Sequence, residues 1–157
     1  MPRGRRTQGG ARGVAVRVLG PGDASVLDRV APEVFDDDVD ARWTAEFFAD
    51  PRHHLAVAID GDTVVGMASA LHYVHPDKPP ELWVNEVGVA PTHRRQGIGR
   101  RLLQALFARG RELGCREAWV LTDDANLAAR GLYAAVGGEE TPAVMVSFPL
   151  FDDQRGN

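Results

Sequence analysis

The stretch VGVAPTHRRQGIGRR, residues 87–101, decides how this chain is interpreted. An apolar, strand-like segment runs into a turn rich in Arg and Gly and then into a helical pattern. Gly97 and Gly99 allow the backbone to approach a ligand closely. The first amides of a helix have no helical acceptor and lie at the positive end of the helix dipole. The turn therefore predicts an anion site, for which a diphosphate flanked by arginines is a fitting ligand.

Two common phosphate motifs do not match this spacing. A P-loop ends in Gly-Lys-Ser/Thr, and the dinucleotide fingerprint reads Gly-x-Gly-x-x-Gly after a strand. Residues 94–99 read Arg-x-x-Gly-x-Gly instead. A helix start with flexible glycine caps and no ligand is the structural alternative.

Around this turn, hydrophobic periodicity predicts alternating strands and helices. Strand patterns cover residues 14–18, 54–59, 63–71, 82–89, 117–121 and 144–150. Helical patterns cover residues 26–35, 43–48, 97–113 and 126–136. The unbroken apolar character of 82–89 predicts burial on both faces. The order β-α-α-β-β-β-α-β-α-β predicts a mixed α/β layer fold.

Length and composition place the chain among ordinary globular proteins. It has 157 residues, 44% apolar and 25% charged, which suits one domain with its own core. We expect residues 1–13, rich in Arg and Gly, to form a flexible tail and residues 14–157 to form the domain. A single cysteine, Cys115, and the absence of zinc-like Cys/His spacing predict neither a disulfide nor a metal site. With no apolar stretch long enough for a membrane helix and no secretory signal pattern, a cytoplasmic protein is expected.

The charged residues are segregated along the chain. Six arginines and no acid lie between 93 and 111, and five arginines and no acid lie between 1 and 17. Between 18 and 92, fourteen acids outnumber four basic residues. Blocks of opposite sign predict one surface for an anion and another for a cation, with a mosaic surface as the alternative. Nucleic acid is not an expected partner, because a diphosphate already accounts for the run at 93–111.

Residues 94–99 resemble the acetyl-CoA motif of the GNAT superfamily of N-acetyltransferases. The preceding strand, the turn at 90–93, the long helix and the helix opened by Asn126 are also similar to that superfamily. The order of elements is similar over residues 14–150. The resemblance implies the GNAT fold, a mixed and mostly antiparallel sheet flanked by helices. In it the fourth and fifth strands are parallel and splay apart.

A closer resemblance is to the aminoglycoside 3-N-acetyltransferases of gentamicin and fortimicin resistance. The similar stretches are 17–21, 64–66, 93–98, 128–133 and 144–145. That family usually has Asp on the strand before the motif, whereas this chain has Glu86, whose longer side chain would alter reach. The resemblance implies acetylation of an aminoglycoside at the 3-amine. A polyamine, another small amine or a protein N-terminus is an alternative acceptor, and a non-catalytic acyl-CoA-binding module is a further alternative.

The resemblance also implies direct transfer from acetyl-CoA to the amine. Glu86 would be the general base, acting through water, and burial on an apolar strand would raise its pKa. A solvent-facing or ion-paired carboxylate is the alternative for this residue. Tyr133 would be the general acid for the leaving thiolate, or else a core aromatic. Asn126 would bind the pantetheine arm, or else only cap its helix. Gly88 would permit the distortion of the splayed strands.

The site residues expected from this resemblance fall into two sets. Those expected to bind acetyl-CoA are Val87, Gly88, Val89, Arg94, Arg95, Gln96, Gly97, Ile98, Gly99, Arg100, Asn126 and Tyr133. Those expected to bind a polycationic amine are Asp36, Asp37, Asp38, Glu46, Glu81, Asp123 and Asp124. Acids attract an acceptor with several ammonium groups, although each acid alone fits a solvated face. The expected partner is a small molecule and not a membrane, and the superfamily resemblance favours a homodimer.

Overall fold

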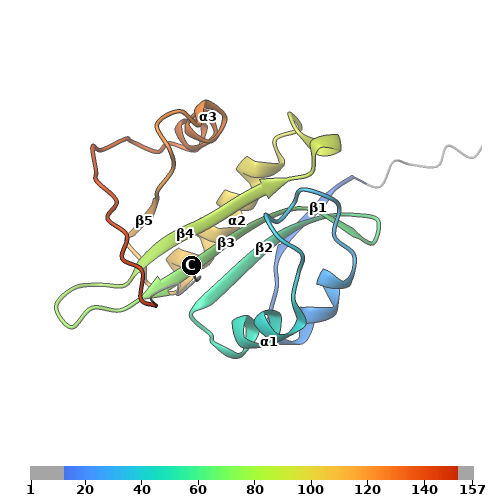
Figure 1. The fold of residues 1–157 in the computed structure, drawn as a ribbon, viewed down its shortest axis with the longest axis horizontal. Coiled ribbons are helices and arrows are strands. Elements are labelled where there is room, and N and C mark those ends of the chain that lie inside the picture. The colour runs from blue at the N-terminus through green and yellow to red at the C-terminus, as the bar shows by residue number, and fades with distance from the viewer. Residues whose placement is uncertain (1–12, 152–157) are drawn as a thin grey trace, which may run out of the picture.

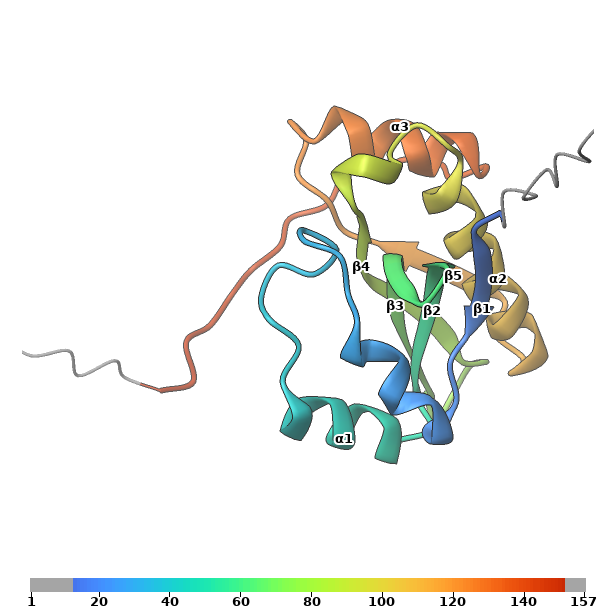
Figure 2. The ribbon, with the colours of Figure 1, turned by 90° about the vertical axis from the view of Figure 1, so that its right-hand side faces the viewer.

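A computed structural model describes residues 13–151 as one mixed sheet with helices on both faces (Figures 1 and 2). The strands are β1 (Ala15–Val18), β2 (His53–Asp60), β3 (Thr63–Tyr73), β4 (Glu81–Val89) and β5 (Glu117–Val120). The helices are α1 (Ala41–Ala49), α2 (Ile98–Glu112) and α3 (Leu127–Ala135), with short 3-10 helices η1 (Pro21–Asp28) and η2 (Pro91–His93). The predicted tail lies outside the described residues except for Gly13.

The strand order is β1-β2-β3-β4-β5, in which the first four are antiparallel neighbours and β5 pairs in parallel with β4. This confirms the predicted GNAT-type sheet. Helix α2 packs on one face, and α1 with η1 lies over the other (Figure 2). None of the helices in the described part of the chain is long and apolar enough to span a membrane.

The core forms where the apolar stripe of α2 meets the sheet. Ile98, Leu102, Leu103 and Leu106 are each almost fully buried. Gly66 on β3 makes room for this helix, because a β-carbon there would lie 3.1 Å from Ile98 and 3.3 Å from Leu102. The predicted helical spacing of 97–113 is therefore confirmed, and Gly114, at φ 84°, ends that helix.

The prediction of a helix over 26–35 is wrong. The chain forms η1 at 21–28 and then runs irregularly to Asp40. The backbone at residues 29–31 forms hydrogen bonds with β3 instead of the bonds of a helix. The Val64 amide donates to Arg29 O and the Ala31 amide donates to Val64 O, both at 2.8 Å. These bonds fix the base of an irregular segment, residues 31–38, which we call the acidic loop.

The prediction of a strand over 144–150 is also wrong. Those residues are extended but pair with no strand in the described part of the chain. Apolar side chains do alternate there, but a strand forms only where a neighbouring strand pairs with its backbone N–H and C=O groups. The chain leaves the body of the domain after α3 instead (Figure 2).

Candidate active site

The site begins where β4 and β5 part. Their parallel pairing ends at Val84 and Val120, while β4 continues through residues 85–89, of which 86–89 pair with β3 alone. The edge of β4 that faces β5 is therefore open beyond Val84. The register of β3 against β4 also shifts between Ser69 and Ala70, opposite Asn85. Such a bulge bends a strand and is common beside active sites.

Gly88 has a different role from the one expected. The bulge lies opposite Asn85, three residues earlier. A β-carbon on Gly88 would instead overlap the carbonyl oxygen of Val34, which lies directly against the strand. Gly88 therefore lets the acidic loop cross β4 at van der Waals distance, and Val34, 2% exposed, anchors that crossing.

The Glu86 side chain opens into a pocket of about 420 Å³ between the sheet, α1 and the acidic loop. The prediction that this strand is buried on both faces is wrong at residues 85 and 86, which are exposed. The acids that line the pocket with Glu86 are Asp36, Asp37, Asp38 and Asp40, and the aromatics are Phe35, Trp43, Phe47 and Phe48. A pocket of this size holds a small molecule, and its aromatics and acids suit a cation.

Partial burial in this pocket raises the pKa of Glu86 above the usual carboxyl value. The Asp36 and Asp37 carboxylates raise it further, because a negative charge on Glu86 would be repelled by theirs. The direction is the one expected for a proton acceptor working near neutral pH.

Only some of the acids predicted to bind the amine lie in the pocket. Asp36, Asp37 and Asp38 line the pocket, whereas Glu46, on α1, pairs with Arg42 at 3.5 Å. Asp40, another acid of the block at 18–92, also lines the pocket; it is the N-cap of α1 and accepts from the Arg42 and Trp43 amides at 2.8 and 3.1 Å.

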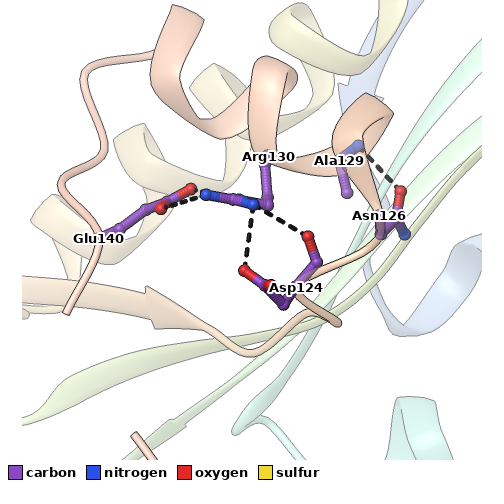
Figure 3. A network of polar contacts seen from close by, with 5 residues as sticks. All are labelled: Asp124, Asn126, Ala129, Arg130 and Glu140. Atoms are coloured by element: carbon purple, nitrogen blue, oxygen red, sulfur yellow. Dashed lines mark hydrogen bonds and ion pairs between the residues drawn. The ribbon is translucent and has the colours of Figure 1, made fainter. Parts of the chain in front are cut away.

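The other three predicted acids lie outside the lining of that pocket. Glu81, at the opposite end of β4 from the pocket, accepts hydrogen bonds from Tyr73 and His75 at 3.1 and 2.8 Å. Asp123 and Asp124 follow β5, and Asp124 pairs with Arg130 at 3.1 Å (Figure 3).

The predicted anion turn has open backbone donors. Gly97 is the N-cap of α2 at φ 73°, and no side chain caps the helix. The first helical bond is Arg101 N to Gly97 O at 3.2 Å, so the amides of Ile98, Gly99 and Arg100 precede it and have no helical acceptor. The first turn contains no acid, which leaves the positive end of the helix dipole uncompensated.

Two neighbours shape this turn further. Arg95 holds φ 60°, a left-handed conformation that is uncommon for non-glycine residues. Gly99 serves helix packing, because its β-carbon would lie 3.1 Å from Leu132 of α3. The Arg94 Nε donates to Val89 O at 3.2 Å, which ties the turn to the end of β4.

Asn126, which precedes α3, and Tyr133, which lies on α3, have different polar groups available to a ligand. Asn126 is a helix cap, since its side-chain oxygen accepts from the Ala129 amide at 3.1 Å (Figure 3), and its amide nitrogen remains for a ligand. Tyr133 packs against the core, and burial raises the pKa of its hydroxyl.

The chemistry that this arrangement can support is group transfer between an anionic carrier and a cationic acceptor. Open helix amides and arginines lie beyond one end of β4, and the acidic pocket opens at Glu86 on the same strand. The described residues contain no cluster of His, Cys, Asp and Glu suited to a metal ion. Cys115 is half-buried with a raised thiol pKa, which is unfavourable for a nucleophile.

Comparison with known proteins identifies the class. Residues 25–137 match the Acetyltransferase (GNAT) family, so the chain belongs to it and is an acetyl-CoA-dependent acetyltransferase by class. It is 42% identical over 91 residues to N-alpha-acetyltransferase RimI of Mycobacterium tuberculosis, covering 57% of this chain and 54% of that protein. It is 32% identical over 105 residues to an aminoglycoside N(6')-acetyltransferase type 1 of Serratia marcescens, covering 64% of this chain and 72% of that protein.

A solved structure has the same fold. An aminoglycoside acetyltransferase from an uncultured soil metagenomic sample superimposes with a TM-score of 0.78 at 19% identity, covering 88% of this chain and 97% of the other. The predicted superfamily and enzyme class are confirmed. The named aminoglycoside relative is an N(6')-acetyltransferase, so the similarity extends to aminoglycoside acetyltransferases and not specifically to the 3-N type.

Proposed function

We propose that this chain acetylates an amine of a small polycationic acceptor, with an aminoglycoside as the leading candidate. The observation that carries the proposal is the pocket in which Glu86 lies beside the acids of residues 36–38 and an aromatic wall. The carboxylates attract ammonium groups. The Arg42 guanidinium lies over one face of the Trp43 ring, 4.7 Å from its centroid, so only the other face would be open to a cationic ring or chain.

In this mechanism the neutral amine attacks the thioester carbonyl carbon, forming a C–N bond as the C–S bond breaks. Glu86 accepts the amine proton, directly or through water, and Tyr133 donates its hydroxyl proton to the leaving sulfur. The backbone amides on the edge of β4 that faces β5, beyond Val84, would stabilise the charge on the carbonyl oxygen. The amides of 98–100 and the side chains of Arg95 and Arg100 would hold the diphosphate of acetyl-CoA.

The identity of the acetylated amine is a separate question. The sequence resemblance predicts the 3-amine, whereas the Serratia relative acts at the 6' position by its name. The similarity to RimI favours a protein N-terminus as the second candidate. We propose the antibiotic amine first, because four aspartates line the pocket. Their combined negative charge matches an acceptor with several ammonium groups better than a peptide with a single N-terminal ammonium group.

The test measures release of CoA thiol with aminoglycosides, spermidine and N-terminal peptides in parallel, and the product is located by NMR. Turnover of an aminoglycoside that falls at least about a hundredfold in Glu86→Gln supports the proposal. Glu81→Gln is the matched control, since it removes a carboxylate from the same strand outside the pocket. Turnover of peptides alone, or equal rates for Glu86→Gln and wild type at every pH, would reject it.

A further inference from the structure

Two polar side chains are buried among residues 13–151, those of His54 and Ser69, at 4% and 9% exposure. The His54 Nε2 lies 2.7 Å from the His72 Nδ1, so the two imidazoles bond to each other. Ser69 is the one residue with a polar side chain in the buried run of β3 from Val64 to Ala70, and an alanine stands on either side of it. Because a buried hydroxyl without a partner is unfavourable, a serine at this position calls for a partner.

The register of the sheet places Ser69 on the floor of the pocket that contains Glu86. Ser69 on β3 is the Cα partner of Leu55 on β2 and of Glu86 on β4. Side chains at directly opposite positions of neighbouring strands project from the same face of a sheet. All three of these residues line the pocket. The Ser69 hydroxyl therefore faces the same space as the Glu86 carboxylate.

The spacing of the strands leaves room for one water between these two side chains. The β-carbons of opposite residues in an antiparallel pair are roughly 4.5–5.5 Å apart. Two hydrogen bonds of about 2.8 Å from one water span up to roughly 5 Å between the oxygens that accept them. A bridging water needs a polar site with at least two partners, and the Ser69 hydroxyl and the Glu86 carboxylate supply two.

We propose that Ser69 is a positioning residue for acetyl transfer, whose hydroxyl holds the water through which Glu86 takes the proton of the attacking amine. The inference rests on the proposed function, in which Glu86 is the base. The water donates one hydrogen to the Glu86 carboxylate and the other to Ser69 Oγ, so its lone pairs face the amine. As the C–N bond forms, the water accepts the N–H proton and passes one of its own to Glu86. One proton moves from nitrogen to carboxylate, and the water and Ser69 are left unchanged.

A neutral hydroxyl fits this position better than a further charge. Asp36 and Asp37 already surround Glu86 with negative charge, which adds to the effect of burial in raising its pKa. Another carboxylate on the sheet would raise that pKa further and would compete with Glu86 for the proton. The Ser69 hydroxyl accepts a hydrogen bond from the water without taking up a proton at neutral pH, so Glu86 remains the proton acceptor.

The first test separates chemistry from binding. Steady-state kinetics use whichever of gentamicin, kanamycin or spermidine the wild type turns over fastest. Ser69→Ala should lower kcat about tenfold or more and change KM by less than about threefold, because the water serves proton transfer and not affinity for the acceptor. Ser69→Thr retains a hydroxyl and should keep most of the wild-type kcat. Thr63→Val, the matched control, removes a hydroxyl from the same strand outside the pocket lining and should change neither constant.

The second test asks whether Ser69 acts through Glu86. In a Glu86→Gln background, Ser69→Ala should lower kcat no further, since the water then has no base to serve. A serine that only supported the packing of the pocket would slow both backgrounds by the same factor. Circular dichroism and thermal melts confirm that each variant folds.

A crystal structure with CoA bound should show an ordered water within about 3.2 Å of both Ser69 Oγ and the Glu86 carboxylate. A wild-type kcat in Ser69→Ala, a change in KM alone, equal losses in both backgrounds, or direct contact between the two side chains would each overturn the inference. The proposed function would survive any of these results, because it depends on the loss of activity in Glu86→Gln. No loss in Glu86→Gln would instead reject the proposed function, and this role of Ser69 with it.

Discussion

Gly88 on β4 lies against the carbonyl oxygen of Val34, closer than a β-carbon on Gly88 would permit. This contact joins two segments more than fifty residues apart and fixes the acidic loop over the strand that carries Glu86. The position of the Asp36–Asp38 carboxylates relative to Glu86 therefore depends on one missing methyl group.

Gly88→Ala should displace the acidic loop from β4. We expect a loss of about 1–3 kcal/mol in unfolding free energy, as for other overpacked sites, and a rise of about tenfold or more in KM for the cationic acceptor. Urea unfolding and steady-state kinetics measure the two. Gly131→Ala on α3 is the control, since a β-carbon there meets nothing within 4 Å and Ala favours a helix. A Gly88→Ala enzyme with unchanged stability and KM would contradict this account of the loop.

Arg95→Gly should move stability and cofactor affinity in opposite directions. Relief of the left-handed backbone at φ 60° contributes about 1 kcal/mol to stability, while loss of the guanidinium weakens binding of CoA about tenfold. Differential scanning fluorimetry and calorimetric titration with CoA measure these. Glu33→Gly is the control, because Glu33 has φ 64° but belongs to the acidic loop. It should gain stability and bind CoA as before. Equal CoA affinity in both variants would remove Arg95 from the diphosphate site.

Glu86 and Glu81 should have opposite effects on stability, although both lie on β4. Burial and the neighbouring aspartates raise the pKa of Glu86, so its ionised form destabilises the fold above that pKa. The hydrogen bond from His75, with Tyr73 and Lys78, lowers the pKa of Glu81, so its ionised form stabilises the fold at neutral pH.

Glu86→Gln should therefore raise Tm at pH 7.5, whereas Glu81→Gln should lower it. The Glu86 difference should shrink as pH falls from its raised pKa to the usual carboxyl pKa. The Glu81 difference should shrink only below the usual carboxyl pKa, because its lowered pKa keeps the folded group ionised until then. Thermal melts of the two variants from pH 7.5 to pH 3 provide the measurement. If both substitutions lowered Tm equally, the Asp36 and Asp37 carboxylates would not be destabilising the ionised Glu86 in the folded state.

Local patterns predicted the five strands and the turn before α2, whereas the arrangement of the sheet followed from the resemblance to the GNAT superfamily. The apolar stripe of residues 97–113 and the glycines at its two ends predict α2 without reference to the elements that pack against it. The role of Gly99 was not predictable in the same way, because it depends on Leu132, more than thirty residues away. A glycine in a phosphate-binding motif and a glycine at a helix crossing have the same local signature.

The pocket at Glu86 depends on contacts between distant residues, which local patterns do not predict. A run of three aspartates is most often a solvated surface, and only the Val64 and Gly88 contacts turn this run toward Glu86. The apolar alternation of 144–150 has the periodicity of a strand, but pairing depends on an edge that the chain does not bring to it. The strand predicted there is therefore absent, because the alternation of a segment cannot supply the neighbour that a strand requires.

His54 should make the fold sensitive to mild acid. It lies at the start of β2, 4% exposed, with its Nε2 2.7 Å from the Nδ1 of His72. Burial first, and then the charges of His72 and Arg109, lower the pKa of His54 to about 4. The unfolded chain has the ordinary value of about 6.5 and so binds a proton that the folded state excludes. Stability should therefore be full above pH 6.5 and fall as pH drops from 6.5 toward 4.

The expected loss over that window is about 3 kcal/mol, because the pKa falls from 6.5 to about 4 and each tenfold change in proton affinity corresponds to 1.36 kcal/mol. Urea unfolding at pH 7.5, 6, 5 and 4.5 measures it. The double variant His54→Leu/His72→Leu removes both partners, so no orphan polar group remains, and its stability should vary less across the window. His53→Gln, on the opposite face of the strand, should retain the wild-type pH dependence. If the double variant kept the full slope, groups other than this buried pair would have to bind the proton.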